Sequence, residues 1–337
     1  MLHAEFDMNG RVIGNGLQPY IIAEAGSNFN QSMDLARRLI DVAAESGADA
    51  VKFQLFRADV LYPAGGEMYE IFKSIELNAG WVPALQDHAR QQGIEFLASA
   101  FDVESVKTLR QVDVAAFKVA SSEATNLQLL YLMASFGKPM IISTAMCDMV
   151  DVEEAVAVCQ AAGNNRIALL QCGAVYPLSP EQVNLRVMQT FVKRFGCPVG
   201  FSDHTLSNHV ALASVGLGAA LIEKHFTLDK TAEGPDHAYA AEPHQLRALV
   251  SEIREAYQAM GSREKEMLPQ ERAVGRREGL YAARTISAGS ILSEGDIEVR
   301  RPALGIRSRH KPVVLGARSL REIQPGEPLT WQLIGFS

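Results

Sequence analysis

Short apolar runs, rich in β-branched residues, alternate with amphipathic segments along the first three quarters of the chain. In one amphipathic segment, residues 33–47, Leu39, Val42 and Ala43 follow the 3.6-residue period of a helix face. We expect eight strands from the apolar runs, at residues 21–24, 50–56, 95–101, 115–121, 139–144, 167–172, 199–204 and 221–226. Eight strand–helix units in about 240 residues favour an α/β protein with a TIM (β/α)8 barrel over an open doubly wound sheet. No G-x-G-x-x-G motif follows the first run, which argues against a dinucleotide site.

The alternation of apolar runs and amphipathic segments ends after Gly261. Residues 262–278 are dense in charge and lack a clear apolar face, so we interpret them as a linker between a barrel domain at 1–261 and a small domain at 279–337. The small domain contains short strand-like runs separated by turns, and the pattern I-x-x-G-x-x-L occurs twice, at 286–292 and 323–329. A domain of about 60 residues is marginally stable alone, so we expect it to pack against the barrel or against another subunit.

Composition narrows the possible partners of the chain. The 337 residues include 32 Lys and Arg against 39 Asp and Glu, a net charge of −7, so nothing indicates binding to nucleic acid or to an anionic membrane. The four cysteines form no C-x-x-C pair, which is typical of reduced thiols in a cytoplasmic protein. The N-terminal segment lacks the apolar run of a signal peptide, and no apolar stretch reaches the ~20 residues that span a bilayer.

Polar residues gather at the ends of the predicted strands, where TIM barrels place their active sites. Lys52 and Lys118 stand inside apolar runs, where a charge is costly unless something compensates it. A structural ion pair would explain one such lysine. Two lysines that converge with hydroxyl groups would suit a phosphate together with a carboxylate. The other polar residues at strand ends are Glu24, Gln54, Ser99, Ser121, Glu123, Ser143, Thr144, Gln171, Tyr176, Ser202, Asp203 and Glu223.

Two histidines, His204 and His225, end neighbouring predicted strands. A lone strand histidine is more often a core residue than a ligand, but two that meet at a barrel mouth could bind a divalent metal. With open positions left for water and substrate, such a pair suits Mn²⁺, Mg²⁺, Zn²⁺ or Fe²⁺. Asp236 and His237 follow the eighth strand and could support the metal or contact a substrate.

These residues belong to longer motifs: IIAEAGSNFN, GADAVKFQLF, FKVASSE, FGKPMIISTAM, VGFSDHT, LIEKHFTLDK and EGPDH. With them, the chain resembles the sialic acid (N-acetylneuraminate) synthases and their pseudaminic acid, legionaminic acid and spore-coat polysaccharide relatives. The segment from about Leu280 onward resembles the SAF, or antifreeze-like, domain of the same enzymes, a small mostly-β domain of the β-clip type. The resemblance covers almost the whole chain, with the motifs in family order.

The resemblance implies a metal-dependent enzyme, a carbon–carbon bond-forming transferase that condenses phosphoenolpyruvate with an N-acetylmannosamine-type or related 2-acetamido sugar and releases phosphate. It implies Mn²⁺ or Mg²⁺ on His204 and His225, and Glu24 and Glu123 facing the reacting groups. It also implies a domain-swapped homodimer, in which the SAF domain reaches the active site of the partner. The phosphoenolpyruvate ligands would be Lys52, Lys118, Ser121, Ser143 and Ser202, and the sugar ligands would be Gln54, Tyr176, Asp236 and Arg301.

Three positions depart from the family pattern toward less polar residues. Phe29 replaces a histidine of the usual N-H-N-G, Ala174 follows Gly173 where the family has T-(S/N), and Leu304 replaces a polar residue of the SAF motif R-P-x-(N/T)-G-I. Two alternatives to the synthase hypothesis therefore stay open. One is a phosphoenolpyruvate-dependent synthase that uses another aldose, and the other is a non-catalytic sugar-binding or scaffolding relative.

Overall fold

The computed structural model describes residues 1–275 and 277–336, which form two compact units, Met1–Gly261 and Ser262–Ser337. Arg276 in the predicted linker and Ser337 at the end of the predicted small domain lie outside the described residues.

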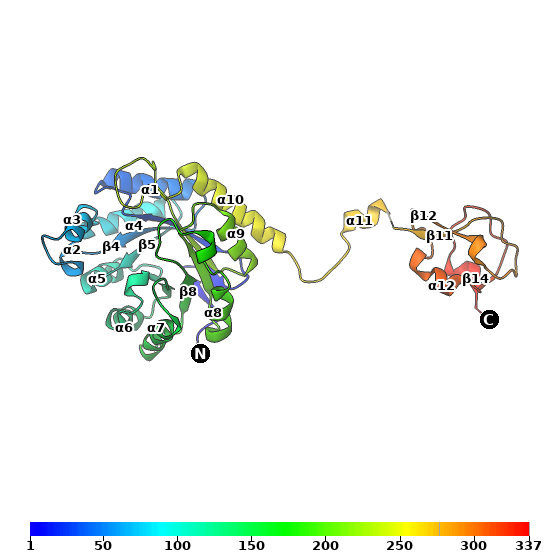
Figure 1. The fold of residues 1–337 in the computed structure, drawn as a ribbon, viewed down its shortest axis with the longest axis horizontal. Helices are drawn as coiled ribbons and strands as arrows, with labels where there is room; N and C mark the ends of the chain where they lie inside the picture. The colour runs from blue at the N-terminus through cyan, green and yellow to red at the C-terminus, as the bar shows by residue number, and fades with distance from the viewer. Residues whose placement is uncertain (276, 337) are drawn as a thin grey trace. The chain divides into compact units, whose positions relative to one another are not determined.

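The first unit is a closed barrel of eight parallel strands in sequential order, as the hydrophobic pattern predicted (Figure 1). The eighth strand, β10, closes the barrel on the first, β3, so every strand edge is paired. The strands are β3 (Tyr20–Gly26), β4 (Ala50–Leu55), β5 (Glu95–Ala100), β6 (Phe117–Val119), β7 (Met140–Ser143), β8 (Ile167–Gln171), β9 (Val199–Asp203) and β10 (Leu221–His225).

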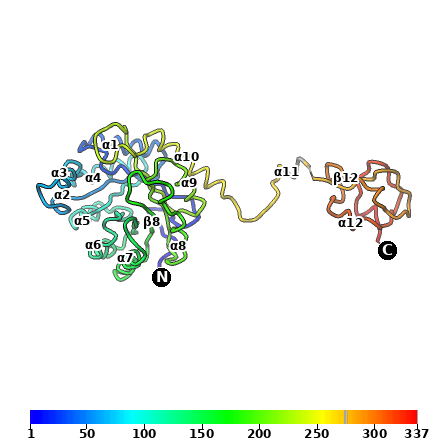
Figure 2. Tube along the Cα trace, viewed as in Figure 1, coloured from blue at the N-terminus to red at the C-terminus, as the bar shows by residue number. Residues whose placement is uncertain are grey.

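Helices cover the outside of the strands and bury the main hydrophobic core between the two layers (Figure 2). Of the neighbouring helices, α1 packs against α4 and α10, α6 against α7, and α9 against α10. The α-helices of this unit are α1 (Met33–Glu45), α2 (Ala58–Leu61), α3 (Glu67–Ser74), α4 (Val82–Gln91), α5 (Val103–Gln111), α6 (Leu127–Ser135), α7 (Met149–Ala161), α8 (Val187–Phe195), α9 (His209–Gly216) and α10 (Pro243–Met260). Short 3₁₀ turns lie at Ala79–Trp81, Ser121–Glu123 and Pro180–Gln182.

A hairpin that the sequence pattern did not predict precedes the barrel. Its strands β1 (Glu5–Met8) and β2 (Arg11–Gly14) pair antiparallel. Phe6, Met8 and Ile13 of the hairpin join one buried cluster with apolar residues of the barrel strands. Just after the hairpin, the Asn15 side chain donates to the carbonyl of Cys197 (2.7 Å) and accepts from the amide of Val199 (2.8 Å) at the start of β9. The hairpin therefore plugs the N-terminal end of the barrel.

The second unit has its own small core, with short antiparallel strand pairs β11–β12 and β13–β14. Its elements are α11 (Pro269–Val274), β11 (Gly279–Ala282), β12 (Ile297–Arg300), α12 (Lys311–Val314), β13 (Arg318–Ser319) and β14 (Ile334–Gly335), with 3₁₀ turns at Glu294–Asp296, Ser308–His310 and Trp331–Leu333. The two I-x-x-G-x-x-L copies meet, because Ile286 and Ile323 exchange both backbone hydrogen bonds (2.9 Å each). The sequence pattern predicted no element within 262–278, but α11 forms there, and the side chain of Glu271 accepts the backbone N–H of Leu268 (2.9 Å) at its N-terminus.

Candidate active site

A cavity of about 480 Å³ opens at the C-terminal ends of the barrel strands. The residues that line it all belong to the first unit. Most residues that the sequence singled out as site candidates are brought together here: Glu24, Lys52, Gln54, Lys118, Ser121, Ser143, Tyr176, Ser202, His204, His225 and Asp236.

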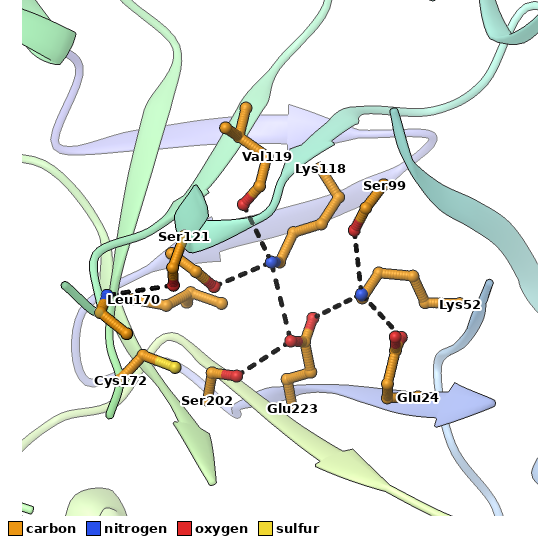
Figure 3. A network of polar contacts seen from close by, with 12 residues as sticks. Glu24, Lys52, Ser99, Lys118, Val119, Ser121, Leu170, Cys172, Ser202 and Glu223 are labelled. Atoms are coloured by element: carbon orange, nitrogen blue, oxygen red, sulfur yellow. Dashed lines mark hydrogen bonds and ion pairs between the residues drawn. The ribbon is translucent and has the colours of Figure 1, made fainter. Parts of the chain in front are cut away.

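Two lysines and two glutamates form a buried network on the floor of this cavity (Figure 3). The Nζ atom of Lys52 lies 2.7 Å from Oε2 of Glu24 and 3.7 Å from Oε2 of Glu223. The Nζ atom of Lys118 lies 3.6 Å from Oε1 of Glu223. None of the four side chains is more than 5% exposed. Charges so deeply buried need partners of opposite sign, and the two ammonium groups balance the two carboxylates.

Four serine hydroxyls surround the charges, at positions Ser99, Ser121, Ser143 and Ser202. Lys52 donates to Ser99 Oγ (3.1 Å) and Lys118 donates to Ser143 Oγ (2.8 Å). Ser202 donates to Glu223 Oε1 (2.9 Å), and Ser121 Oγ accepts the backbone N–H of Ala145 (3.0 Å). Hydroxyls can turn toward a new acceptor, so the floor offers two cations and several donors to an incoming anion.

The two carboxylates, Glu24 and Glu223, have different pKa values because their surroundings differ. Burial raises the pKa of Glu24 to about 7; the nearby Lys52 opposes this shift and Glu223 adds to it. Burial acts on Glu223 too, but the attraction of Lys118 and Lys52 outweighs it and holds the pKa of Glu223 at about 2. Near neutral pH, Glu223 is a permanent counter-ion for both lysines, whereas Glu24 can hold or release a proton.

The pKa values of the two lysines are also shifted in opposite directions. Burial lowers the pKa of Lys118 below its ordinary value, and Glu223 only partly offsets that effect. Burial also acts on Lys52, but Glu223 and Glu24 together raise its pKa. An anion bound between the two ammonium groups would therefore favour the charged form of Lys118 most.

The two strand-end histidines face each other, with ring centroids 5.4 Å apart. The ring N–H at Nδ1 of His204 donates to the carbonyl of Gly173 (2.6 Å), which leaves Nε2 with a free lone pair. Nδ1 of His225 is buried and has no hydrogen-bond partner within the part of the chain that the structure describes. Burial, together with His225, lowers the pKa of His204 to about 4, and burial lowers the pKa of His225 also, so both rings are neutral at pH 7. Neutral imidazoles with unused nitrogens are suitable ligands for a divalent cation.

Among residues 1–275 and 277–336, no group of three or more His, Cys, Asp or Glu side chains is arranged to hold a metal by itself. A cation on His204 and His225 would then need water or substrate for its remaining positions, which is the pattern of a catalytic rather than a structural metal site.

A wall of aromatic and acidic groups borders the histidines. The Tyr176 ring lies tilted by 37° against the His204 ring (4.2 Å between centroids), and Tyr239 Oη donates to Oδ1 of Asp236 (2.6 Å). A Cβ on Gly26, which has φ +54°, would lie 2.8 Å from Oδ2 of Asp236, so a side chain there would displace that carboxylate. His237 lies outside this wall and bonds Thr227 and Asn30, a structural role.

Two of the predicted site residues are not among those that line this cavity. Glu123 is half-buried, accepts a hydrogen bond from Asn126 (3.3 Å) and does not line the cavity, so the structure pairs Glu24 with Glu223 instead. Arg301 belongs to the second unit, where it forms an ion pair with Glu278 (3.1 Å).

The site also contains residues that had no predicted role, chiefly Glu223, Ser99 and Tyr239. A signal for Glu223 existed, because it stands two residues before His225 in a strand and therefore faces the same side. Tyr239 lies in a loop after the last strand, where no periodicity could indicate its direction.

The three departures from the family pattern fall in different surroundings. Phe29 is fully buried in the core, with its ring centroid 6.0 Å from that of Phe53, and does not line the cavity. Leu304 is 68% exposed on the second unit. Ala174 does line the cavity. Of the three changes, the one at Ala174 alters the cavity wall directly.

A closed (β/α)8 barrel with paired buried lysines, split carboxylates and two neutral histidines at its mouth defines a barrel enzyme that handles an anionic substrate. The NeuB family model matches residues 39–265 and the SAF domain model matches residues 277–334. The chain belongs to the NeuB family, the sialic acid and related nonulosonic acid synthases of polysaccharide biosynthesis, whose reaction is a phosphoenolpyruvate-dependent condensation.

Individual relatives are similar to this chain over most of their length. An N,N'-diacetyllegionaminic acid synthase from Legionella pneumophila is 38% identical over 95% of this chain and 96% of its own, and the human N-acetylneuraminate-9-phosphate synthase is 36% identical over 86% and 85%. The crystal structure of the spore coat polysaccharide biosynthesis protein SpsE from Bacillus subtilis matches with a TM-score of 0.71 and 35% identity, covering 99% of this chain and 100% of that one. Within the part of the chain that the structure describes, no helix is both long and apolar enough to cross a membrane.

Proposed function

We propose that this enzyme condenses phosphoenolpyruvate with the open-chain form of an N-acetylmannosamine-type or related 2-acetamido sugar and releases phosphate. C3 of phosphoenolpyruvate bonds to the aldehyde carbon, water adds at C2, and the C2–O bond to phosphate breaks. The observation that carries the proposal is the floor network, since two buried ammonium groups beside serine hydroxyls match the phosphate and carboxylate of phosphoenolpyruvate.

In this proposal, Lys52 and Lys118 bind and orient the phosphoenolpyruvate anion, with Ser121, Ser143 and Ser202 completing its hydrogen bonds. Glu223 keeps both lysines in place. Glu24, with a pKa of about 7, can hold a proton near neutral pH and lies in the same cavity, so we assign to it the proton that the aldehyde oxygen takes up when it becomes a hydroxyl. Gln54, Tyr176 and Asp236 contact the sugar.

His204 and His225 would hold a divalent cation, Mn²⁺ or Mg²⁺, through their unused ring nitrogens. When bound, such a cation supplies Lewis-acid polarisation of the sugar's carbonyl group.

The test follows phosphate release with phosphoenolpyruvate, Mn²⁺ and a panel of 2-acetamido sugars, and identifies the nine-carbon product by mass spectrometry. Lys118→Met should lower the rate by at least about 100-fold. Lys107→Met, which removes an exposed lysine of α5, should leave the rate unchanged. Absence of phosphate release with every sugar, with metal present, would overturn the proposal.

We also propose a homodimer in which Arg301 in the SAF domain of one subunit reaches the sugar in the partner's active site, and the match of residues 277–334 to the SAF domain supports this arrangement. Subunit mixing tests this arrangement. His204→Ala and Arg301→Ala proteins should each be inactive or weak, whereas a reassorted mixture should regain up to roughly a quarter of the wild-type rate. An arginine acting within its own subunit would leave the mixture no more active than its components.

A further inference from the structure

Asp236, which we propose contacts the sugar, lies in a loop whose backbone gives it little support. The connection from β10 to α10, residues 226–242, has no helix and only one isolated β-bridge, between Phe226 and Ala241. An aspartate side chain has two rotatable bonds, so in such a loop it can adopt several orientations. The direction of the Asp236 carboxylate therefore depends on the side chains around it.

Tyr239 supplies a contact to one oxygen of this carboxylate. It stands three residues later in the same loop, and its hydroxyl donates to Oδ1 of Asp236 (2.6 Å). A hydrogen bond to a charged acceptor is stronger than one between neutral groups. The Tyr239 ring packs against two other rings of the cavity wall, with its centroid 5.0 Å from that of Tyr176 and 5.3 Å from that of His225. These contacts restrict the ring, so its hydroxyl holds Asp236 from a defined direction.

The other oxygen, Oδ2 of Asp236, faces the space that Gly26 leaves open. A Cβ on Gly26 would lie 2.8 Å from this oxygen. The same Cβ would lie 3.6 Å from Oε1 of Glu24 and 3.6 Å from Nδ1 of His225, two buried atoms that have no hydrogen-bond partner among residues 1–275 and 277–336. Oδ2 of Asp236 is therefore directed to the place where the proposed proton donor and a proposed metal ligand come together.

We infer that Tyr239 is a positioning residue, whose hydroxyl holds the Asp236 carboxylate with Oδ2 toward the reacting end of the sugar. Without that hydroxyl, the carboxylate would turn among several rotamers, and binding of the sugar would have to select the competent one at a cost in affinity. Phosphoenolpyruvate binds to the floor lysines in the proposed function, so its affinity should not depend on Tyr239. This inference rests on the proposed function, in which Asp236 contacts the sugar, and adds a residue to it.

The experiment uses Tyr239→Phe, which removes the hydroxyl and keeps the ring. With the 2-acetamido sugar of the panel that releases phosphate fastest, KM for the sugar should rise by at least about tenfold. KM for phosphoenolpyruvate and the dissociation constant of Mn²⁺ should each change by less than about twofold, because the variant leaves the ion pairs of Lys52 and Lys118 intact. An unchanged KM for the sugar, or equal losses for both substrates, would overturn the inference.

A double-mutant cycle with Asp236→Ala separates positioning from a direct effect of the hydroxyl on the sugar. In the Asp236→Ala protein there is no carboxylate to hold, so adding Tyr239→Phe should change kcat/KM for the sugar by less than about twofold, and a further loss of about tenfold would contradict the inference. Tyr69→Phe is the matched control, because the Tyr69 hydroxyl donates to Oδ1 of Asp59 (2.7 Å) and neither residue lines the cavity. Its KM values should equal those of the wild type. Absence of phosphate release by the wild-type enzyme would overturn the proposed function itself, and this inference with it.

Discussion

Replacing Glu223 with glutamine tests whether one carboxylate holds the two active-site lysines in the barrel. Glutamine keeps the shape of the side chain and can still accept the hydrogen bond from Ser202, but it removes the negative charge. With Nζ–O distances of 3.7 and 3.6 Å and an effective dielectric constant of about 20, each attraction to Lys52 and Lys118 is about 4.5 kcal/mol. The carboxylate's own desolvation offsets part of this, and breaking a buried ion pair typically costs about 3–5 kcal/mol.

We therefore expect Glu223→Gln to lower the free energy of unfolding of the barrel by at least about 3 kcal/mol. For a unit of this size, that loss shifts the barrel's melting transition down by roughly 6–12 °C in a calorimetric scan. Glu104→Gln is the matched control. It breaks an exposed pair with Lys107, in which both side chains are 55% accessible, and should cost less than about 1 kcal/mol.

Added phosphoenolpyruvate separates this explanation from a general loss of packing. A bound anion supplies the negative charge that the variant lacks, so saturating ligand should narrow the gap in melting temperature between Glu223→Gln and the wild type. A variant that melts within about 1 °C of the wild type, or a gap that widens with ligand, would refute the reasoning.

Three further predictions concern the rest of the site. His204→Ala should abolish both Mn²⁺ binding, measured by calorimetric titration, and turnover; turnover that survives would disprove the metal assignment. Because the pKa of Glu24 is raised on folding, its contribution to stability is complete below pH ~4.5 and is lost as the pH rises to about 7. Glu24→Gln should therefore remove this decline in melting temperature between pH 5 and pH 7.5. An unchanged decline in the variant would contradict the prediction. Asp203→Asn should lower the free energy of unfolding by about 3 kcal/mol, because it breaks the buried ion pair with Lys224 (2.8 Å). It should also weaken Mn²⁺ binding, because this pair connects the strand ends that carry His204 and His225. Unaltered Mn²⁺ affinity would show that the pair does not position the two histidines.

The sequence predicted the barrel well because each strand is short and rich in apolar residues, as expected where both faces of a parallel sheet are buried. Most of the predicted site residues line the cavity, because residues toward the carboxyl ends of those strands, such as Gln54, Ser143 and His225, meet at one end of the barrel. Glu123 was misplaced relative to the cavity because it follows a strand that ends early, at Val119, and a 3₁₀ turn redirects the side chain.

Features set by three-dimensional packing were beyond the sequence pattern. The hairpin of β1 and β2 has four-residue strands whose apolar positions count only because the barrel end is there to receive them. The pKa difference between Glu24 and Glu223 depends on a few ångströms of distance to the lysines, which no residue spacing reveals.

The hairpin at the base of the barrel has a kinetic consequence. Phe6, Met8 and Ile13 fill the N-terminal end of the barrel, and the cavity opens at the opposite end of the strands. A ligand of the floor must therefore enter before the sugar fills the outer part of the cavity. Dead-end inhibition should therefore show compulsory order, with phosphoenolpyruvate first, and an acceptor bound too early would block the enzyme at high concentration.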